Sequence, residues 1–180
     1  MKTLIVYYSL TGNTRLICET LKKNMSADIQ RLREQRQYNR ISAYVTGLAA
    51  AVRGSGRAIL PLEEDVSGYD RIVIAAPVWA EHLAPPMVTF LRCYDLRNKS
   101  VYVLLTHTGE TGQIVDVVKE EVMRSEGKLG GITMMQLTPE LVEGLQKQKL
   151  ALWLNTETGT VQVEQMAQKY PNMTQPNRRG

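Results

Sequence analysis

Short apolar runs that alternate with helical patterns restrict the fold of this chain more than any other feature. The runs are rich in Val, Ile, Leu and Ala, and they cover residues 3–8, 27–33, 71–76, 100–105 and 131–137. Helical spacing follows at residues 16–21, 42–52, from Pro85-Pro86 onward, and at 114–123, 139–154 and 161–169. Because parallel strands need right-handed crossovers, this alternation predicts an α/β, doubly wound parallel sheet.

The chain of 180 residues fits one domain. We expect that domain over residues 1–170, followed by a polar, flexible tail at 171–180. Residues 35–69 form an unusually long connection between the second and third strands. This insertion is either a functional lid or edge covering, or a plain surface helix, and the sequence leaves both readings open.

Composition narrows the class of protein further. No run reaches the roughly 18 apolar residues of a membrane span, and the N-terminus lacks a cleavage-site pattern, so we expect a cytoplasmic protein without a membrane partner. Cys18 and Cys93 are the two cysteines. They have no metal-ligand spacing, so no metal site and no disulfide framework is predicted, and both are expected to be buried thiols.

A mild positive charge of +4 accompanies a group of arginines near the end of the second run. These arginines could attract an anionic partner or form a solvated edge. No aromatic residues interleave with them, which argues against a nucleic-acid partner. The group comprises Arg31, Arg33, Arg36 and Arg40.

Polar loops follow three of the expected strands, beginning at Ser9, Pro77 and Thr106. In an open α/β sheet, ligands bind beyond the carboxyl ends of the strands. Since these ends share one edge of a parallel sheet, the three loops are expected to build a single site.

The first loop offers hydroxyl groups, an amide and a glycine at the start of a helix, where free backbone amides favour a phosphate. No lysine follows as in a P-loop, and no G-x-G-x-x-G occurs, so a monophosphate is favoured. In the alternative reading, Thr11 or Asn13 only caps the helix and Gly12 makes the turn. The loop consists of Ser9, Leu10, Thr11, Gly12, Asn13 and Thr14.

The second loop is Pro77, Val78, Trp79 and Ala80. Trp79 could stack on a planar ligand or belong to the core, and its neighbours favour an ordered loop in which the indole faces the site. Just beyond it, His82 could contact ligand or solvent.

The third loop carries hydroxyl groups at Thr106 and Thr108, and Gly109 and Gly112 allow backbone amides to face a ligand. Polar turn chemistry is the alternative for this loop. His107 is the group that could become cationic beside an electron-rich ring.

Together these motifs resemble the flavodoxin family over about residues 1–135. Residues 7–14 match its phosphate loop, Pro77-Val78-Trp79-Ala80 its ring-covering loop, and Thr106-His107-Thr108-Gly109 its third loop. The resemblance implies a flavodoxin-like sheet of five parallel strands in the order 2-1-3-4-5, for which flavodoxin is the standard example. It further implies FMN, with the phosphate on residues 9–14 and the ring between the Trp79 and Thr106 loops.

The leading hypothesis is an FMN-dependent oxidoreductase that passes electrons from NAD(P)H or a reductase to a small acceptor such as a quinone. Arg40, Arg53 and Arg57 could recognise an NADPH phosphate, or could simply be solvated. The alternatives are an electron carrier that docks to a redox partner protein, and a non-redox binding or regulatory protein. One departure from the family is Glu81, which stands where many relatives carry glycine and restricts positive φ angles.

Overall fold

Five parallel strands form the centre of the molecule. The computed structural model describes residues 1–36 and 40–166; for residues 40–45 it describes the backbone alone. Their order is β2-β1-β3-β5-β6, and every neighbouring pair is parallel. The predicted order 2-1-3-4-5 is therefore confirmed. The strands are β1 (Thr3–Tyr7), β2 (Ala27–Arg31), β3 (Arg71–Trp79), β5 (Ser100–His107) and β6 (Lys128–Gln136).

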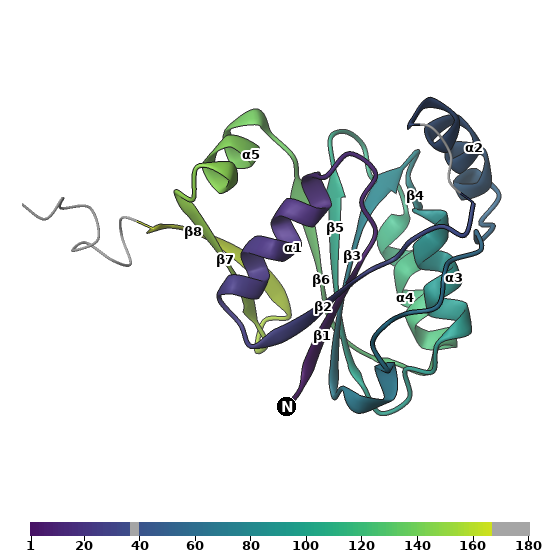
Figure 1. The fold of residues 1–180 in the computed structure, drawn as a ribbon, viewed down its shortest axis with the longest axis horizontal. Coiled ribbons are helices and arrows are strands. Elements are labelled where there is room, and N and C mark those ends of the chain that lie inside the picture. The colour runs from purple at the N-terminus through teal and green to yellow at the C-terminus, as the bar shows by residue number, and fades with distance from the viewer. Residues whose placement is uncertain (37–39, 167–180) are drawn as a thin grey trace, which may run out of the picture.

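Helices cover both faces of this sheet, as Figure 1 shows. Alternate residues of β1 serve the two layers, because side chains of a strand point to opposite faces: Leu4 and Val6 join one apolar cluster, and Ile5 and Tyr7 the other. One layer contains α1 (Asn13–Lys23) and α5 (Pro139–Gln146). The other contains α2 (Arg40–Val52), α3 (Pro85–Cys93) and α4 (Ile114–Arg124), and a short 3-10 turn, η1 (Val66–Gly68), precedes β3.

The central strands extend further than the sequence predicted. Pro77 pairs with Thr106 across β3 and β5, so the segment 77–79, expected as a loop, is strand. After a two-residue turn, β4 (His82–Leu83) runs back antiparallel to the end of β3. This hairpin gives the end of β3 a second set of backbone partners, which a single-strand pattern cannot reveal.

The last third of the chain contains the largest error of the sequence prediction. The helix expected over 139–154 ends at Gln146, and residues 161–165, expected to be helical, belong to a strand. Instead, β7 (Leu150–Asn155) and β8 (Thr160–Gln165) form an antiparallel hairpin. Residues 160–165 alternate apolar and polar side chains, and this period of two outweighed the apparent helical spacing. The hairpin lies against α1, where the Asn24 amide donates to the Leu152 carbonyl at 3.2 Å.

Two further expectations can be compared with the structure. Cys18 is buried in α1, and its burial raises the pKa of the thiol, but Cys93 is exposed at the end of α3, so the prediction for Cys93 is wrong. The expected tail at 171–180 lies outside the described residues. None of the described helices combines the length and the apolar character that crossing a membrane requires.

Candidate functional site

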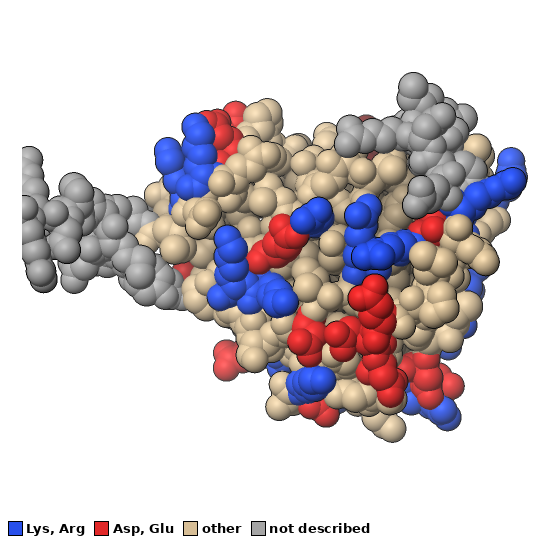
Figure 2. Space-filling model, in the orientation of Figure 1, with Lys and Arg blue, Asp and Glu red and all other residues tan. Residues whose placement is uncertain are grey.

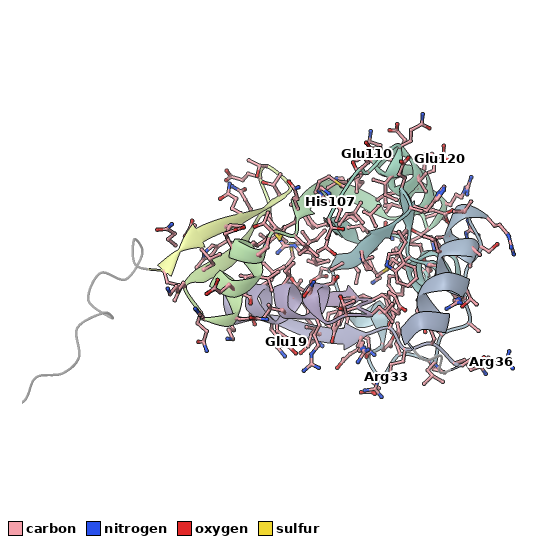
Figure 3. All side chains as sticks on the ribbon, turned by 90° about the horizontal axis from the view of Figure 1, so that it is seen from above. Glu19, Arg33, Arg36, His107, Glu110 and Glu120 are labelled. Atoms are coloured by element: carbon pink, nitrogen blue, oxygen red, sulfur yellow. The ribbon has the colours of Figure 1, made fainter. Side chains whose placement is uncertain are left out.

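The carboxyl ends of β1, β3 and β5 bring the three predicted loops to one edge of the sheet. Figure 3 looks down on this edge, with His107 and Glu110 on one side of the molecule and Arg33 on the other. The phosphate loop, residues 9–14, leaves β1 and enters α1. The two remaining segments, 80–81 and 108–113, follow β3 and β5.

The phosphate loop has the geometry of an open helix start. Gly12 is the N-cap of α1 with φ 102°, a conformation that favours glycine, and no side chain caps the helix. The alternative in which Thr11 or Asn13 caps α1 is thus not what the structure adopts. The Gly12 amide donates to Ser9 Oγ at 3.1 Å, and the first helical bond runs from the Leu16 amide to the Gly12 carbonyl. The amides of residues 13–15 have no hydrogen-bond partner among the described residues.

Thr14 connects the phosphate loop to β5. Its Oγ1 lies 2.9 Å from Thr106 Oγ1, and both side chains are buried. The side chain of Thr106 points to the same face of the sheet as those of Tyr102 and Leu104. Those two residues belong to the apolar cluster that α1 covers, so Thr106 lies close to α1. One hydroxyl hydrogen suffices for this contact, so the pair retains a second hydrogen that can be donated to a ligand.

Trp79 is placed differently from the prediction. Its side chain is only 7% exposed, so the indole is not on the open surface that the prediction favoured. The ring meets Tyr8 edge to face, with centroids 5.7 Å apart. On another side it touches α2 at Gly47, where a Cβ would overlap the indole. The physical reason is that the insertion covers Trp79, and its glycine allows the helix to approach the ring.

A largely buried polar cluster holds the base of this insertion. The Tyr8 hydroxyl donates to Glu34 Oε1 at 2.7 Å, and Arg57 Nη1 donates to Glu34 Oε2 at 2.7 Å. Arg57 also donates to Thr46 in α2. Burial, and next the hydrogen bond to Glu34, raises the pKa of Tyr8. The cluster ties residues on both sides of α2 to the end of β1.

The turn between β3 and β4 has an unfavourable backbone for its residues. Ala80 has φ 45° and Glu81 has φ 64°, and their pairing neighbours are Trp79 and His82. A two-residue hairpin turn with two positive φ angles is normally occupied by Asn or Gly. The Glu81 side chain packs on Gly112, where a Cβ would overlap its carboxylate. The two loops expected to hold a ring therefore touch each other.

The two histidines of the site differ in their contacts. The His107 ring nitrogen Nδ1 lies 2.8 Å from the Gly109 carbonyl oxygen, so His107 braces its own loop. His82 is half-buried and belongs to β4. Thr108 and Gly109 are exposed beyond the end of β5.

Sequence reasoning did not predict that four residues close the second loop, although it considered Arg57 for an NADPH phosphate. These residues are Tyr8, Glu34, Gly47 and Arg57. One signal was available, since Tyr8 and Glu34 lie just beyond the ends of two strands that are neighbours in the predicted order. The approach of Gly47 to Trp79 had no such signal, because it depends on how the insertion folds back over the sheet.

Known proteins resemble this chain in sequence and in fold. A sequence model described as flavodoxin matches residues 2–157. Among solved structures, a flavoprotein from Lactobacillus acidophilus NCFM in complex with FMN is 22% identical, covers 79% of this chain and 97% of its own, and has a TM-score of 0.61. No curated protein matches the chain.

Two further structures share the fold at lower identity. Oxidised flavodoxin 2 from Bacillus cereus is 19% identical, with 82% of this chain and 94% of its own covered and a TM-score of 0.50. General stress protein 14 from Treponema denticola, in complex with FMN, is 8% identical, with 82% and 92% covered and a TM-score of 0.51. At these identities the similarity shows the fold alone.

Proposed function

The chain belongs to the flavodoxin family, and from this premise we propose that it binds FMN and transfers electrons. The observation that carries the proposal is the open start of α1. There, amides that have no partner within the described part of the chain, together with hydroxyl groups, surround a turn at Gly12, and the first turn of the helix has no acidic residue. This donor set fits a phosphate monoester, because amide dipoles and hydroxyl hydrogens all favour an anion.

The remainder of the site fits the rest of the nucleotide. The Thr14 and Thr106 hydroxyls link the phosphate loop to the end of β5, next to which a ribityl chain would lie. The backbone of residues 80–82 and 108–112 then flanks the place for the flavin ring. Since Glu81 packs on Gly112, we propose that these two segments separate when the ring enters. FMN, when bound, supplies reversible acceptance of one or two electrons.

The direction of electron flow is the finer part of the proposal. We propose that NAD(P)H or a reductase donates electrons and that a small acceptor such as a quinone receives them. In this scheme no side chain acts as a general acid or base; the protein orients the cofactor and controls access to it.

A second candidate, an electron carrier that docks to protein partners, is favoured by one specific observation. Arg57, one of three arginines considered for an NADPH phosphate, is instead engaged with Glu34, and both side chains are almost buried, at 12% and 11% exposure. The Arg40 side chain lies outside the described residues, which leaves Arg53 as the exposed member of the group. Direct reduction by NADPH thus has less support than FMN binding.

Two measurements test these proposals. Titration of the apoprotein with FMN should quench flavin fluorescence at a stoichiometry of one, and a protein that cannot be reconstituted contradicts both redox functions. Anaerobic mixing of the yellow holoprotein with NADPH should bleach it if NADPH is the donor. Colour that persists with NADPH but disappears with a chemical reductant identifies the carrier.

One substitution probes the phosphate loop without touching the core. Thr11 is exposed, and Thr11→Ala should weaken FMN binding by about 1.5–3 kcal/mol if its hydroxyl donates to the phosphate. Thr156→Ala, in the exposed turn of the β7–β8 hairpin, is the matched control and should leave the affinity unchanged. Equal affinities in both variants would exclude a contact from Thr11.

A further inference from the structure

Arg31 brings a positive charge to the phosphate loop from the neighbouring strand. It is the last residue of β2 and pairs in register with Tyr7, the last residue of β1. Because the two strands are parallel, its side chain starts at the edge where the chain turns into residues 9–14. Its Nη2 donates to the Ser9 carbonyl at 3.3 Å, at the first residue of the loop.

The guanidinium of Arg31 is not neutralised by a carboxylate of the described residues. Arg15, in the first turn of α1, pairs with Glu19 at 2.7 Å, and Arg33 lies 3.9 Å from Glu63. Arg31 has no ion pair within 1–36 and 40–166, and a guanidinium carries five N–H donors, most of which remain available beside Ser9. In Figure 2, basic side chains gather over the upper end of β2, and acidic side chains lie below them.

The start of α1 adds positive potential at the same place. The amides of residues 13–15 lack partners among the described residues, no acidic residue occupies the first turn, and Glu19 is already engaged by Arg15. A neutral cradle of hydroxyls and amides would suffice for a weakly charged ligand. A cradle beside a guanidinium that has no carboxylate partner among the described residues suits a dianion, the form that a phosphate monoester takes near neutral pH.

We propose that Arg31 is a phosphate-recognition residue, through which the loop selects a flavin that carries a 5′-phosphate over the same flavin without it. The inference rests on the proposed FMN-binding function and adds a charged group to the loop of residues 9–14. Arg31 reaches the ligand from β2, so its contribution is separable from that of the loop hydroxyls and amides.

A purely structural role for Arg31 makes a different prediction. If its side chain only tethers the Ser9 carbonyl, its loss disturbs the loop for every ligand. If it attracts the phosphate, its loss affects the phosphorylated ligand alone. Comparing FMN with riboflavin therefore separates the two roles, since the ligands differ by the phosphate.

The experiment titrates the full-length apoprotein with FMN and with riboflavin, for the wild type and for Arg31→Gln, Arg31→Lys and Arg33→Gln, by flavin fluorescence. Arg31→Gln should weaken FMN binding about tenfold, the usual size for a hydrogen bond to a charged group, and change riboflavin binding less than about twofold. Arg31→Lys should recover part of the loss, and Arg33→Gln is the surface control. Raising NaCl should weaken FMN binding more in the wild type than in Arg31→Gln.

Each outcome decides the matter. Equal losses for FMN and riboflavin in Arg31→Gln would assign Arg31 a structural role and overturn the inference, and so would unchanged affinities for both. Wild-type protein that binds neither flavin would overturn the proposed function itself. If the wild type binds FMN, but Arg31→Gln lowers the FMN and riboflavin affinities equally or changes neither, only the proposed role of Arg31 is overturned.

Discussion

The two halves of the site are built in different ways. The phosphate half is open: Gly12 turns the chain, no side chain caps α1, and Arg31 approaches from β2. The ring half is closed on itself, because Trp79 is buried under α2 and Glu81 packs on Gly112. On the proposed function, the phosphate half is a preformed anchor, and the ring half opens when the ring enters.

The contrast follows from the distance along the chain over which each half is assembled. Most donors of the phosphate half lie within residues 9–15, so local backbone geometry is enough to arrange them. The ring half joins β1, the insertion, β3 and the loop before α4. Its side chains meet other segments of the protein before they meet any ligand.

Replacing Trp79 tests this contrast with the largest expected effect. We expect Trp79→Ala to lower the free energy of unfolding by about 3–5 kcal/mol, since it leaves a cavity between Tyr8 and Gly47. Urea unfolding of the apoprotein measures this, with Trp79→Phe as a milder control. An apoprotein of unchanged stability whose FMN affinity drops would mean that the indole faces the ligand, as the sequence alone suggested.

Tyr8→Phe removes one hydrogen bond from the cluster that holds the insertion. We expect a loss of about 1–3 kcal/mol in unfolding free energy, because the buried Glu34 carboxylate loses the Tyr8 hydroxyl and keeps Arg57. Limited proteolysis within residues 34–60 should accelerate at the same time. Tyr94→Phe, whose hydroxyl accepts from the Leu62 amide at 3.3 Å outside this cluster, should not change the cleavage of that segment.

Each half contains a turn residue with a positive φ angle, Gly12 in the phosphate half and Ala80 in the ring half, and the two can be changed in opposite directions. Gly12→Ala should destabilise the protein by about 1–2 kcal/mol, since φ is 102° there. A Cβ would find open space, so the cost comes from backbone strain and not from a steric clash. We also expect weaker FMN binding. Full stability and affinity in Gly12→Ala would show that the turn is adaptable and that the phosphate half is not preformed.

Ala80→Gly should have the smallest effect and the opposite sign. Ala80 is exposed with φ 45°, so glycine should stabilise the folded state by up to about 1 kcal/mol once the greater freedom of the unfolded chain is deducted. Thermal unfolding of the apoprotein measures the difference. A destabilised Ala80→Gly would mean that the turn is not strained.

The same contrast explains what the sequence could predict. The alternation of strands and helices was recognisable because hydrophobic runs are local patterns, and the strand order followed from the family resemblance, which rests largely on the local cluster at residues 9–14. The burial of Trp79 was not, because it depends on Gly47, 32 positions earlier in the numbering, reaching the ring through the fold of the insertion. The β7–β8 hairpin was misread because residues 150–154 are all apolar, and a short continuous apolar run does not distinguish a strand from a buried helix.

The phosphate half is expected to keep its shape when a ligand binds, and the ring half is expected to open. The most direct measurement follows backbone amide resonances of the isotopically labelled apoprotein as inorganic phosphate, and then FMN, is added. We expect phosphate to shift the amides of residues 10–15 and leave residues 79–82 and 107–112 unchanged, and FMN to shift all three segments. Phosphate that leaves residues 10–15 unshifted, or FMN that leaves residues 79–82 unshifted, would contradict the account.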